Sequence, residues 1–310
     1  MMRIGIVGAG IAGLACAEEL TNLGHHVRLF DKGRGPGGRM ATRRISTSAG
    51  EAYFDHGAQY FTAHNDTFHR KVASWISEGA AAHWPPAGSD AYVGVPTMNA
   101  PVRLMAKGQS VDWNTLVKRI EQFGRGWRLV FDRGEAVDVD IAVVATPAEQ
   151  ASDLLASVAP DLAARARAAV SEPCWTLMLA FFESVAVEQN CWRAQDIIGW
   201  AARNSSKPGR IGPESWVVQA SPSWSRLHLE ADPNWVSVTL KGALSNMLAI
   251  PMPAVAGESC HRWRFARSGA DGSGASFDRN RHIGLCGDWL IGPRVEAAWL
   301  SGKALAEQIG

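Results

Sequence analysis

The chain has 310 residues, of which 46% are hydrophobic and 20% are charged, with 31 basic and 30 acidic side chains. This length predicts two domains with a sizeable core, and the apolar fraction excludes a largely disordered chain. A formal net charge of +1 gives no broad electrostatic field, so we expect neither nucleic acid nor a membrane as the main partner.

The cysteines predict no disulfide framework and no metal site, because they are five in number and no two of them are spaced as C-x-x-C. This usage fits a reducing compartment, and we expect a cytoplasmic protein. The apolar runs, such as Leu177–Phe182, are far shorter than the roughly 20 residues that span a bilayer. Arg3 followed by the apolar stretch Ile4–Ala17 resembles the basic and hydrophobic start of a signal peptide. The glycines inside that stretch favour a nucleotide-binding turn instead.

The first element in chain order is a short buried strand, Arg3–Val7, which leads into the pattern G-x-G-x-x-G over residues 8–13. A helical stretch, Leu14–Leu23, follows at once, and His26–Phe30 reads as a second strand. A glycine turn between a strand and a helix is typical of a dinucleotide-binding unit. A glycine-rich turn without a ligand is the alternative.

Each glycine of this turn has a physical task. Gly8 makes the tight turn, Gly10 lets the backbone approach a pyrophosphate, and Gly13 lets the helix pack on the strand. The helix N-terminus supplies free N–H groups and a positive dipole end. Asp31 lies eighteen positions after Gly13, where an acid that accepts ribose hydroxyl hydrogen bonds is expected.

A second glycine-rich loop, residues 33–38, comes directly after Asp31 and ends at Arg39. Arginine pairs with two phosphate oxygens at once, and glycines permit close backbone approach. We therefore expect this loop to fold back over the same pyrophosphate, with a flexible surface turn as the alternative.

The end of the chain repeats the strand–turn–helix order. Ile283–Cys286 reads as a strand, Gly287 and Asp288 form a turn, and a helix runs from about Arg294 to Ile309. A carboxylate beside a helix N-terminus suits ribityl or ribose hydroxyls. An ordinary structural turn is the alternative.

The middle of the chain predicts strands at Trp127–Asp132 and Val137–Val144, then an Ala-rich helix over residues 151–170. Apolar β-rich runs predict a second sheet from Cys174–Phe182, Trp216–Gln219 and Val236–Leu240. Loops rich in Gly, Ser and Pro are expected at Ala87–Asp90, Asn204–Gly212 and Ser268–Ser276.

Taken together, these motifs resemble the renalase-like branch of the flavin amine oxidase superfamily. The matching strings extend over essentially the whole chain; they are Ile6–Ala15, Phe30–Met40, Asp55–Thr62, Ala145–Pro147, Ala202–Pro208, Cys286–Trp289 and Arg294–Gly302. One difference is that Asp31 stands where the wider amine oxidase group commonly has Glu, and a shorter carboxylate still reaches a ribose.

The resemblance implies an α/β fold with a discontinuous Rossmann-like FAD-binding domain (residues 1–62, 100–150 and 272–310) and a mixed α+β substrate domain (63–99 and 151–271). It implies an oxidase that converts 2- and 6-dihydro isomers of NAD(P)H to NAD(P)+ and reduces oxygen to hydrogen peroxide. FAD is expected to bind without a covalent link, since no Cys lies in Asp288–Gly302. The implied cofactor-binding residues are Gly8, Gly10, Ala12, Gly13, Asp31, Lys32, Arg39, His56, Gly57, Gln59, Val111, Asp288 and Val295.

Hydride transfer to flavin needs the substrate ring held close and dry, and no acid, base or nucleophile, so we expect no catalytic side chain. The candidate substrate residues are Tyr60, Arg203, Asn204, His261 and Trp289, for which core packing, a solvated loop or a satisfied backbone carbonyl are the alternatives. An amine or other carbon–nitrogen oxidase and a non-catalytic flavin-binding protein remain alternative functions on the same scaffold. The expected small-molecule partners are a dinucleotide and oxygen.

Overall fold

The amino-terminal strand lies inside a six-stranded sheet in the computed structural model, which describes all 310 residues. Every neighbouring pair in this sheet is parallel except β17 and β18. The strand order is β17 (Ser276–Asp278), β18 (Ile283–Leu285), β11 (Ile141–Val144), β1 (Arg3–Val7), β2 (His26–Phe30) and β7 (Val111–Asp112). The strands predicted at Arg3–Val7 and His26–Phe30 are confirmed, as is the one beginning at Ile283.

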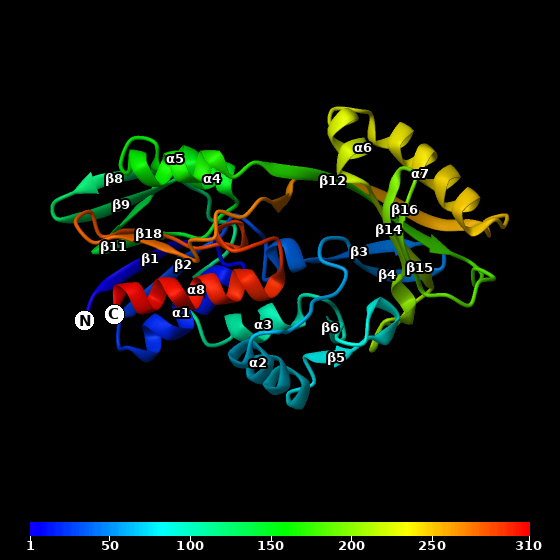
Figure 1. Ribbon diagram of the computed structural model, residues 1–310, viewed down its shortest axis with the longest axis horizontal. Helices are drawn as coiled ribbons and strands as arrows, with labels where there is room; N and C mark the ends of the chain where they lie inside the picture. Colours follow the sequence, from blue (N-terminus) through cyan, green and yellow to red (C-terminus); the bar gives the residue numbers. More distant parts are fainter.

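Alternate residues of β1 face two different layers. Ile4 and Ile6 pack with α1 (Ile11–Asn22) and α8 (Val295–Ile309), which lie together on one face of the sheet (Figure 1). Val7 belongs to the core on the other face, and a side chain at Gly5 would collide there with Leu129 and Val139. Successive side chains of a strand point to opposite faces of the sheet, so a strand with a core on each face is apolar at neighbouring positions.

The second face is covered by a three-stranded antiparallel sheet and two helices. Its elements are β8 (Val117–Phe123), β9 (Gly126–Phe131), β10 (Ala136–Val139), α4 (Ala148–Leu155) and α5 (Pro160–Ala168). The single strand predicted at Val137–Val144 is therefore two, because Val139 pairs with β9 whereas Ile141 pairs with β1. The single helix predicted over 151–170 is also two, because Pro160 begins a new helix.

A five-stranded antiparallel sheet forms the other half of the molecule. Its order is β13 (Cys191–Gln195), β14 (Ile198–Arg203), β15 (Glu214–Ala220), β12 (Ser171–Phe181) and β16 (Val255–Ser268). The long strands β12 and β16 pair with each other and join the two halves, as Figure 1 shows. The strands predicted at Cys174–Phe182 and Trp216–Gln219 are confirmed.

The run Val236–Leu240 is not a strand, and that prediction was wrong. It lies in α7 (Pro233–Leu248), which covers the outer face of the five-stranded sheet together with α6 (Pro222–Leu227). Asp232 caps this helix by accepting from the backbone of Asn234 and Trp235. Burial of one helix face then outweighs the strand preference of its β-branched residues.

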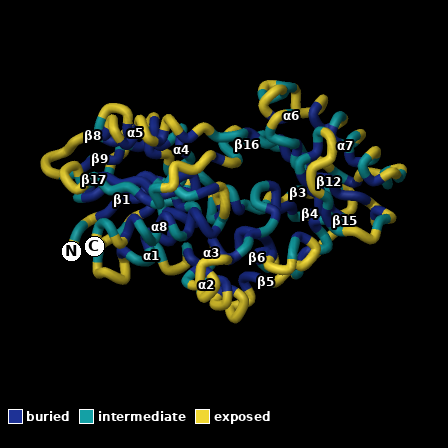
Figure 2. The backbone as a smooth tube through the Cα atoms, in the orientation of Figure 1, coloured by how far each residue is buried: buried dark blue, intermediate teal, exposed yellow.

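The remaining helices and strands pack beside the two sheets. They are β3 (Thr42–Thr47), β4 (Gly50–Asp55), α2 (Asp66–Ser77), β5 (Ala81–His83), β6 (Tyr92–Gly94) and α3 (Ala100–Ala106). Helix α2 and strand β5 lie at the lower edge in Figure 1. Phe68 and Trp75 of α2 belong to the same core as Leu14 and Trp299. Figure 2 shows buried backbone running through both halves. The fold is α/β, a Rossmann-like half joined to a mixed α and β half.

Candidate functional site

The glycine turn after β1 has the shape that a dinucleotide needs. Gly8 has φ +103°, and a Cβ there would lie 2.6 Å from the carbonyl oxygen of Ala145. A Cβ at Gly13 would lie 2.1 Å from the carbonyl oxygen of Gly8, so helix and strand approach too closely for a side chain. A Cβ at Gly10 would meet nothing within 4 Å, which leaves open space above the turn.

Asp31 ties this turn to the second glycine-rich loop. One oxygen of its carboxylate accepts from the backbone N–H of Ala9 and the other from that of Gly33, each at 2.7 Å. The site of a Cβ on Gly38 lies 3.6 Å from the Cα of Gly10. The two glycine loops are therefore neighbours, with their exposed backbone on the same side of β1.

Arg39 connects the second loop to the end of the chain. Its guanidinium donates two hydrogen bonds to the carboxylate of Asp288, at 2.8 and 2.6 Å, and Asp288 is buried. The carbonyl oxygen of Arg39 accepts from the N–H of Ala58 at 2.8 Å. The hydroxyl of Thr146, next to Gly8, is buried without a hydrogen-bond partner. The two glycine-rich loops, the turn that contains Asp288 and the unpartnered hydroxyl of Thr146 thus meet where a dinucleotide cofactor fits.

One row of side chains crosses the inner face of the five-stranded sheet. Directly opposite residues on antiparallel strands point to the same face, and the register places five such residues in line. From β13 to β16 they are Arg193, Trp200, Gln219, Thr176 and His261.

This row packs on residues 56–60, which follow β4. The imidazoles of His56 and His261 are 5.1 Å apart, and Trp263 lies 5.0 Å from His56. The rings of Tyr60 and Trp200 are 5.3 Å apart at the other end.

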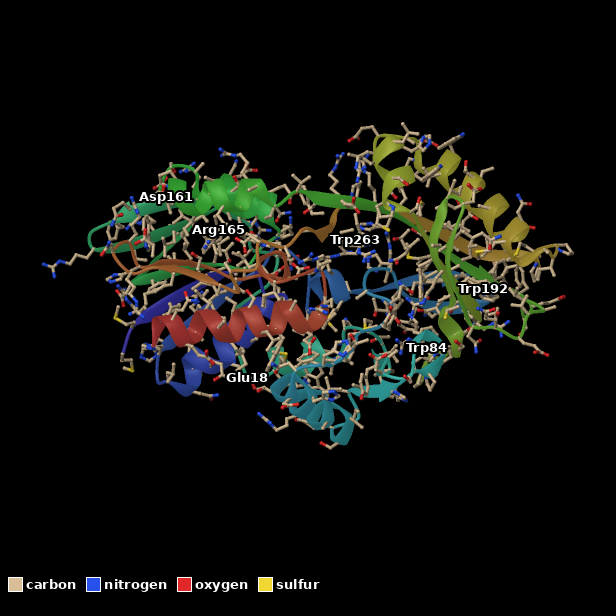
Figure 3. All side chains as sticks on the ribbon, in the orientation of Figure 1. Glu18, Trp84, Asp161, Arg165, Trp192 and Trp263 are labelled. Carbon is tan, nitrogen blue, oxygen red and sulfur yellow. The ribbon has the colours of Figure 1, made fainter.

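Two hydrogen bonds to backbone carbonyls fix the segment further. Gln219 donates to the carbonyl oxygen of Gly57 at 2.8 Å, and the indole of Trp263 donates to that of His56 at 2.8 Å. Figure 3 places Trp263 at the junction of the two halves. Residues 56–60 therefore lie between the cofactor turns and the row.

The histidine end of the row is uncharged at neutral pH. Burial, followed by unfavourable interaction of a protonated His56 with the imidazole of His261 and the guanidinium of Arg43, lowers the pKa of His56 to about 4. Burial also lowers the pKa of His261. The Nδ1 atom of His56 is buried and has no hydrogen-bond partner. Neutral imidazoles of this kind present polar atoms without adding charge.

A buried ion network lies beneath residues 56–60. The carboxylate of Asp55 accepts from the ammonium of Lys207 at 3.1 Å and from the guanidinium of Arg210, and all three groups are almost fully buried. Burial alone would raise the pKa of Asp55, but the positive charges of Lys207 and Arg210 lower it by a larger amount. The pKa of Asp55 is therefore below the usual range. Burial lowers the pKa of Lys207 to about 8, although Asp55 opposes this shift. Lys207 also donates to Gln59 at 3.3 Å.

Four other predicted cofactor residues lie around the glycine turn. Ala12 is in the first turn of α1, and Val295 is the first residue of α8. Val111 is in β7 and pairs with β2 just before Asp31. Lys32 is exposed and its ammonium donates to Gln150. The structure places all four on elements that border the turn or Asp31.

Three predicted substrate residues lie away from the row and bind other parts of the chain. Arg203 pairs with Glu214 at 3.0 Å and donates to carbonyls of residues 185 and 187. Asn204 is fully buried and donates to the carbonyl of Tyr53. Trp289 is fully buried in the core around β11 and donates to the carbonyl of Thr146. Tyr60 and His261 are the two predicted substrate residues that the structure brings to the row.

Among the residues of this region that sequence reasoning missed are Lys207, Arg193, Trp200 and Gln219. Lys207 lies in a string that resembles the family, which is a signal for it. Nothing in the sequence marks the other three, because their alignment depends on the pairing of four strands.

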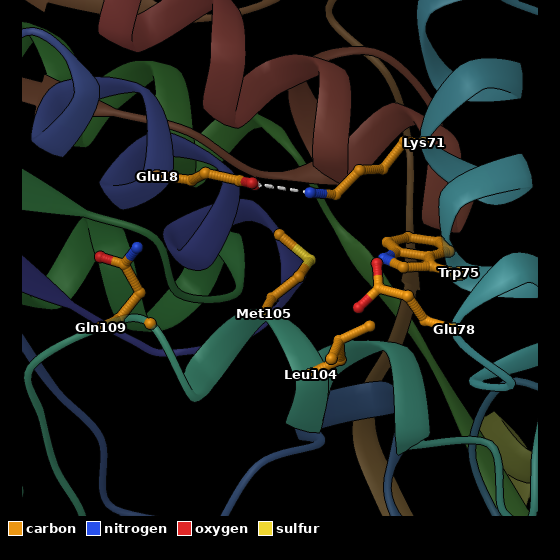
Figure 4. Close-up of a pocket in the computed structure, with 8 residues that line it drawn as sticks. Glu18, Lys71, Trp75, Glu78, Leu104, Met105 and Gln109 are labelled. Atoms are coloured by element: carbon orange, nitrogen blue, oxygen red, sulfur yellow. Dashed lines mark hydrogen bonds and ion pairs between the residues drawn. The ribbon is translucent and has the colours of Figure 1, made fainter.

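A separate surface pocket of about 230 Å³ lies between α1, α2 and α3 (Figure 4). It is crossed by the ion pair between Glu18 and Lys71, at 2.7 Å, and contains none of the predicted site residues. No three His, Cys, Asp or Glu side chains are grouped as a metal site. None of the helices combines the length and apolar character that a membrane span requires.

Two family models match the chain. One, described as an NAD(P)-binding Rossmann-like domain, covers residues 6–74, and the other, described as flavin containing amine oxidoreductase, covers residues 81–226. The chain is also 24% identical to mouse renalase over 298 residues, which is 86% of this chain and 85% of renalase.

Solved structures show the same fold at low identity. A protein from Exiguobacterium sp. 255-15 assigned as a protoporphyrinogen oxidase superposes with a TM-score of 0.71 and 13% identity, over 99% of this chain and 98% of that one. A putrescine oxidase bound to putrescine superposes with a TM-score of 0.68 and 14% identity, again over 99% and 98%. At these identities the likeness concerns the fold alone.

Proposed function

We propose that this chain, which belongs to the flavin amine oxidase superfamily and uses FAD as its cofactor, oxidises 2- and 6-dihydro isomers of NAD(P)H to NAD(P)+. The main support is the similarity to renalase, which extends along 86% of the chain. In the balanced reaction, the isomer loses a hydride, and this hydride with one proton reduces one oxygen molecule to one hydrogen peroxide.

The chain's own residues would hold FAD along the turns described above. Gly10 and Gly38 would leave the backbone exposed for the pyrophosphate, and Asp31 would accept from ribose hydroxyls. Arg39 and Asp288 would lie further along the bound cofactor. When bound, FAD supplies an acceptor for the hydride, and its reduced form passes two electrons to oxygen. We propose non-covalent binding, so acid precipitation should leave FAD in the supernatant and not in the pellet.

The row would hold the substrate, and residues 56–60, of which His56, Gly57 and Gln59 would also contact FAD, would lie between the substrate and the cofactor turns. The neutral side chains of His56, His261 and Gln219 suit an uncharged dihydronicotinamide with its carboxamide. Burial of this region keeps water away from the transferred hydride. No general acid or base is required, so the work of these residues is to position the ring.

Anaerobic mixing of the FAD-loaded protein with a panel of reductants tests the proposal. The panel holds the 2- and 6-dihydro isomers of NADH and NADPH together with putrescine and a monoamine. The isomers should bleach the flavin absorbance rapidly, and readmitted air should restore it with one hydrogen peroxide per turnover. Bleaching by amines alone would indicate a carbon–nitrogen oxidase, and no bleaching would indicate a non-catalytic flavin-binding protein.

We also propose the cytoplasm as the location, since all five cysteines are free. The domain boundaries given above remain a prediction. Limited proteolysis of the FAD-loaded protein, with the fragments identified by mass, would locate them.

A further inference from the structure

We propose that Arg193 binds the phosphate next to the nicotinamide ribose, and that it makes the enzyme prefer nucleotides over the corresponding ribosides. The inference rests on the proposed function, because it concerns the same substrate. It adds a binding group that neither the motifs nor the resemblance indicates.

The guanidinium of Arg193 is held in place by two aromatic rings. It lies 5.0 Å from the ring centre of Trp200 and 5.4 Å from that of Tyr60. It donates to the hydroxyl of Tyr60 at 3.0 Å and to the carbonyl oxygen of Ala87. Arginine stacks on rings in this way and keeps other N–H groups free for a phosphate.

No carboxylate lies within ion-pair distance of Arg193. The neighbouring cations Lys207 and Arg210 share the single carboxylate of Asp55, so this network has one more positive than negative charge. Arg193 is exposed, whereas Tyr60 and Trp200 beneath it are half-buried and buried. An accessible, rigidly held cation without an acidic partner is suited to an anion from solution.

The neighbourhood of Arg193 has further unsatisfied donors. The indole nitrogens of Trp84 and Trp200 are buried and have no hydrogen-bond partner. Trp84 lies against the ammonium of Lys207, 5.5 Å from its ring centre. Buried N–H groups are nearly always paired in complete structures, so this cluster is short of acceptors.

The polarity of the row matches the polarity of a nicotinamide nucleotide. Its histidine end is neutral and its Arg193 end is positive. Two strand spacings, about 10 Å in all, separate Gln219 from Arg193. A nucleotide has its first phosphate one ribose away from the ring. A ring near Gln219 therefore brings that phosphate toward Arg193.

The test compares two substrates that differ only in the phosphate: the 6-dihydro forms of nicotinamide mononucleotide and of nicotinamide riboside. Arg193→Met should lower kcat/KM for the mononucleotide by about tenfold or more, mainly through KM, since charge-assisted hydrogen bonds are lost. It should lower kcat/KM for the riboside, which has no phosphate, much less than for the mononucleotide. Equal losses on both substrates would overturn the inference.

Arg226→Met is the matched control, because Arg226 is an exposed arginine of the same half that pairs with Glu172. Arg226→Met should leave kcat/KM unchanged for both the mononucleotide and the riboside. Arg193→Lys keeps the charge without the planar fork and should lie between wild type and Arg193→Met.

Calorimetric binding of NAD+ and of nicotinamide riboside separates this inference from the proposed function. Arg193→Met should weaken NAD+ binding about tenfold or more and weaken riboside binding much less. If wild type binds NAD+ through Arg193 but oxidises no isomer, the proposed function fails and the phosphate site stands. If the isomers are oxidised but NAD+ binds both proteins equally, the phosphate site fails alone.

Discussion

The two sheets of this protein position functional groups in different ways. In the six-stranded sheet, the groups follow the carboxyl ends of parallel strands: the glycine turn follows β1, Asp31 follows β2, Thr146 follows β11 and Asp288 follows β18. In the five-stranded sheet, the groups project from the middle of one face, one from each strand. The first arrangement is local in sequence and the second depends on strand register.

Asp55 joins the two halves, and its removal should have the largest effect. Asp55→Ala leaves Lys207 and Arg210 buried without a counter-charge, which should destabilise the protein by about 3–5 kcal/mol. Glu230→Ala is the control, because Glu230 also pairs with two arginines but is 67% exposed. Chemical denaturation of both variants measures the difference. Equal losses would mean that the Asp55 network does not hold the halves together.

A pH effect at His56 should be next in size. Its pKa is lowered from 6.5 to about 4 on folding, so the neutral form is favoured in the folded state. Above pH 6.5 His56 is neutral in both states and does not affect the free energy of unfolding. As the pH falls from 6.5 to 4, only the unfolded state takes up the proton, so the free energy of unfolding decreases by about 3 kcal/mol across this window. Urea unfolding in excess FAD between pH 7 and 4 should therefore show a smaller acid loss for His56→Gln than for wild type.

His69 is exposed, so His69→Gln should follow the wild-type pH curve. An unchanged curve for His56→Gln would mean that His56 is not held neutral by the five-stranded sheet.

The arginines of the second glycine loop test the other half. Arg39→Ala should weaken FAD binding by roughly 1.5–3 kcal/mol, about tenfold or more, because a charged hydrogen-bonding group beside Asp288 is lost. Arg34→Ala should have a smaller effect, since Arg34 is exposed in the outer part of the loop. FAD titration into the two apoproteins compares them, and equal losses would contradict the position of the loop.

The contrast between the sheets explains what the sequence could predict. Strand β1, the glycine turn, helix α1 and Asp31 form one continuous stretch, so spacing alone was sufficient to recognise them. The ion pair between Arg39 and Asp288 joins residues 249 positions apart, and only their separate motifs were visible.

The other half was harder, for two physical reasons. In Val236–Leu240, β-branched residues suggested a strand, whereas the Asp232–Pro233 cap and the four-residue spacing of Val236, Leu240 and Leu244 indicate a helix. The row from Arg193 to His261 is assembled by strand pairing, which a single sequence does not specify. Trp289, assigned to the substrate from its neighbouring motif, is instead core.

The central claim is that the two halves together hold a dihydronicotinamide ring with C2 or C6, and not C4, next to the flavin. The most direct measurement is stopped-flow flavin reduction without oxygen by NADH and by its 2- and 6-dihydro isomers at equal concentrations. A ring clamped for C2 or C6 displaces C4, so NADH should react about 10²-fold more slowly. Reduction by NADH as fast as by either isomer would contradict the claim.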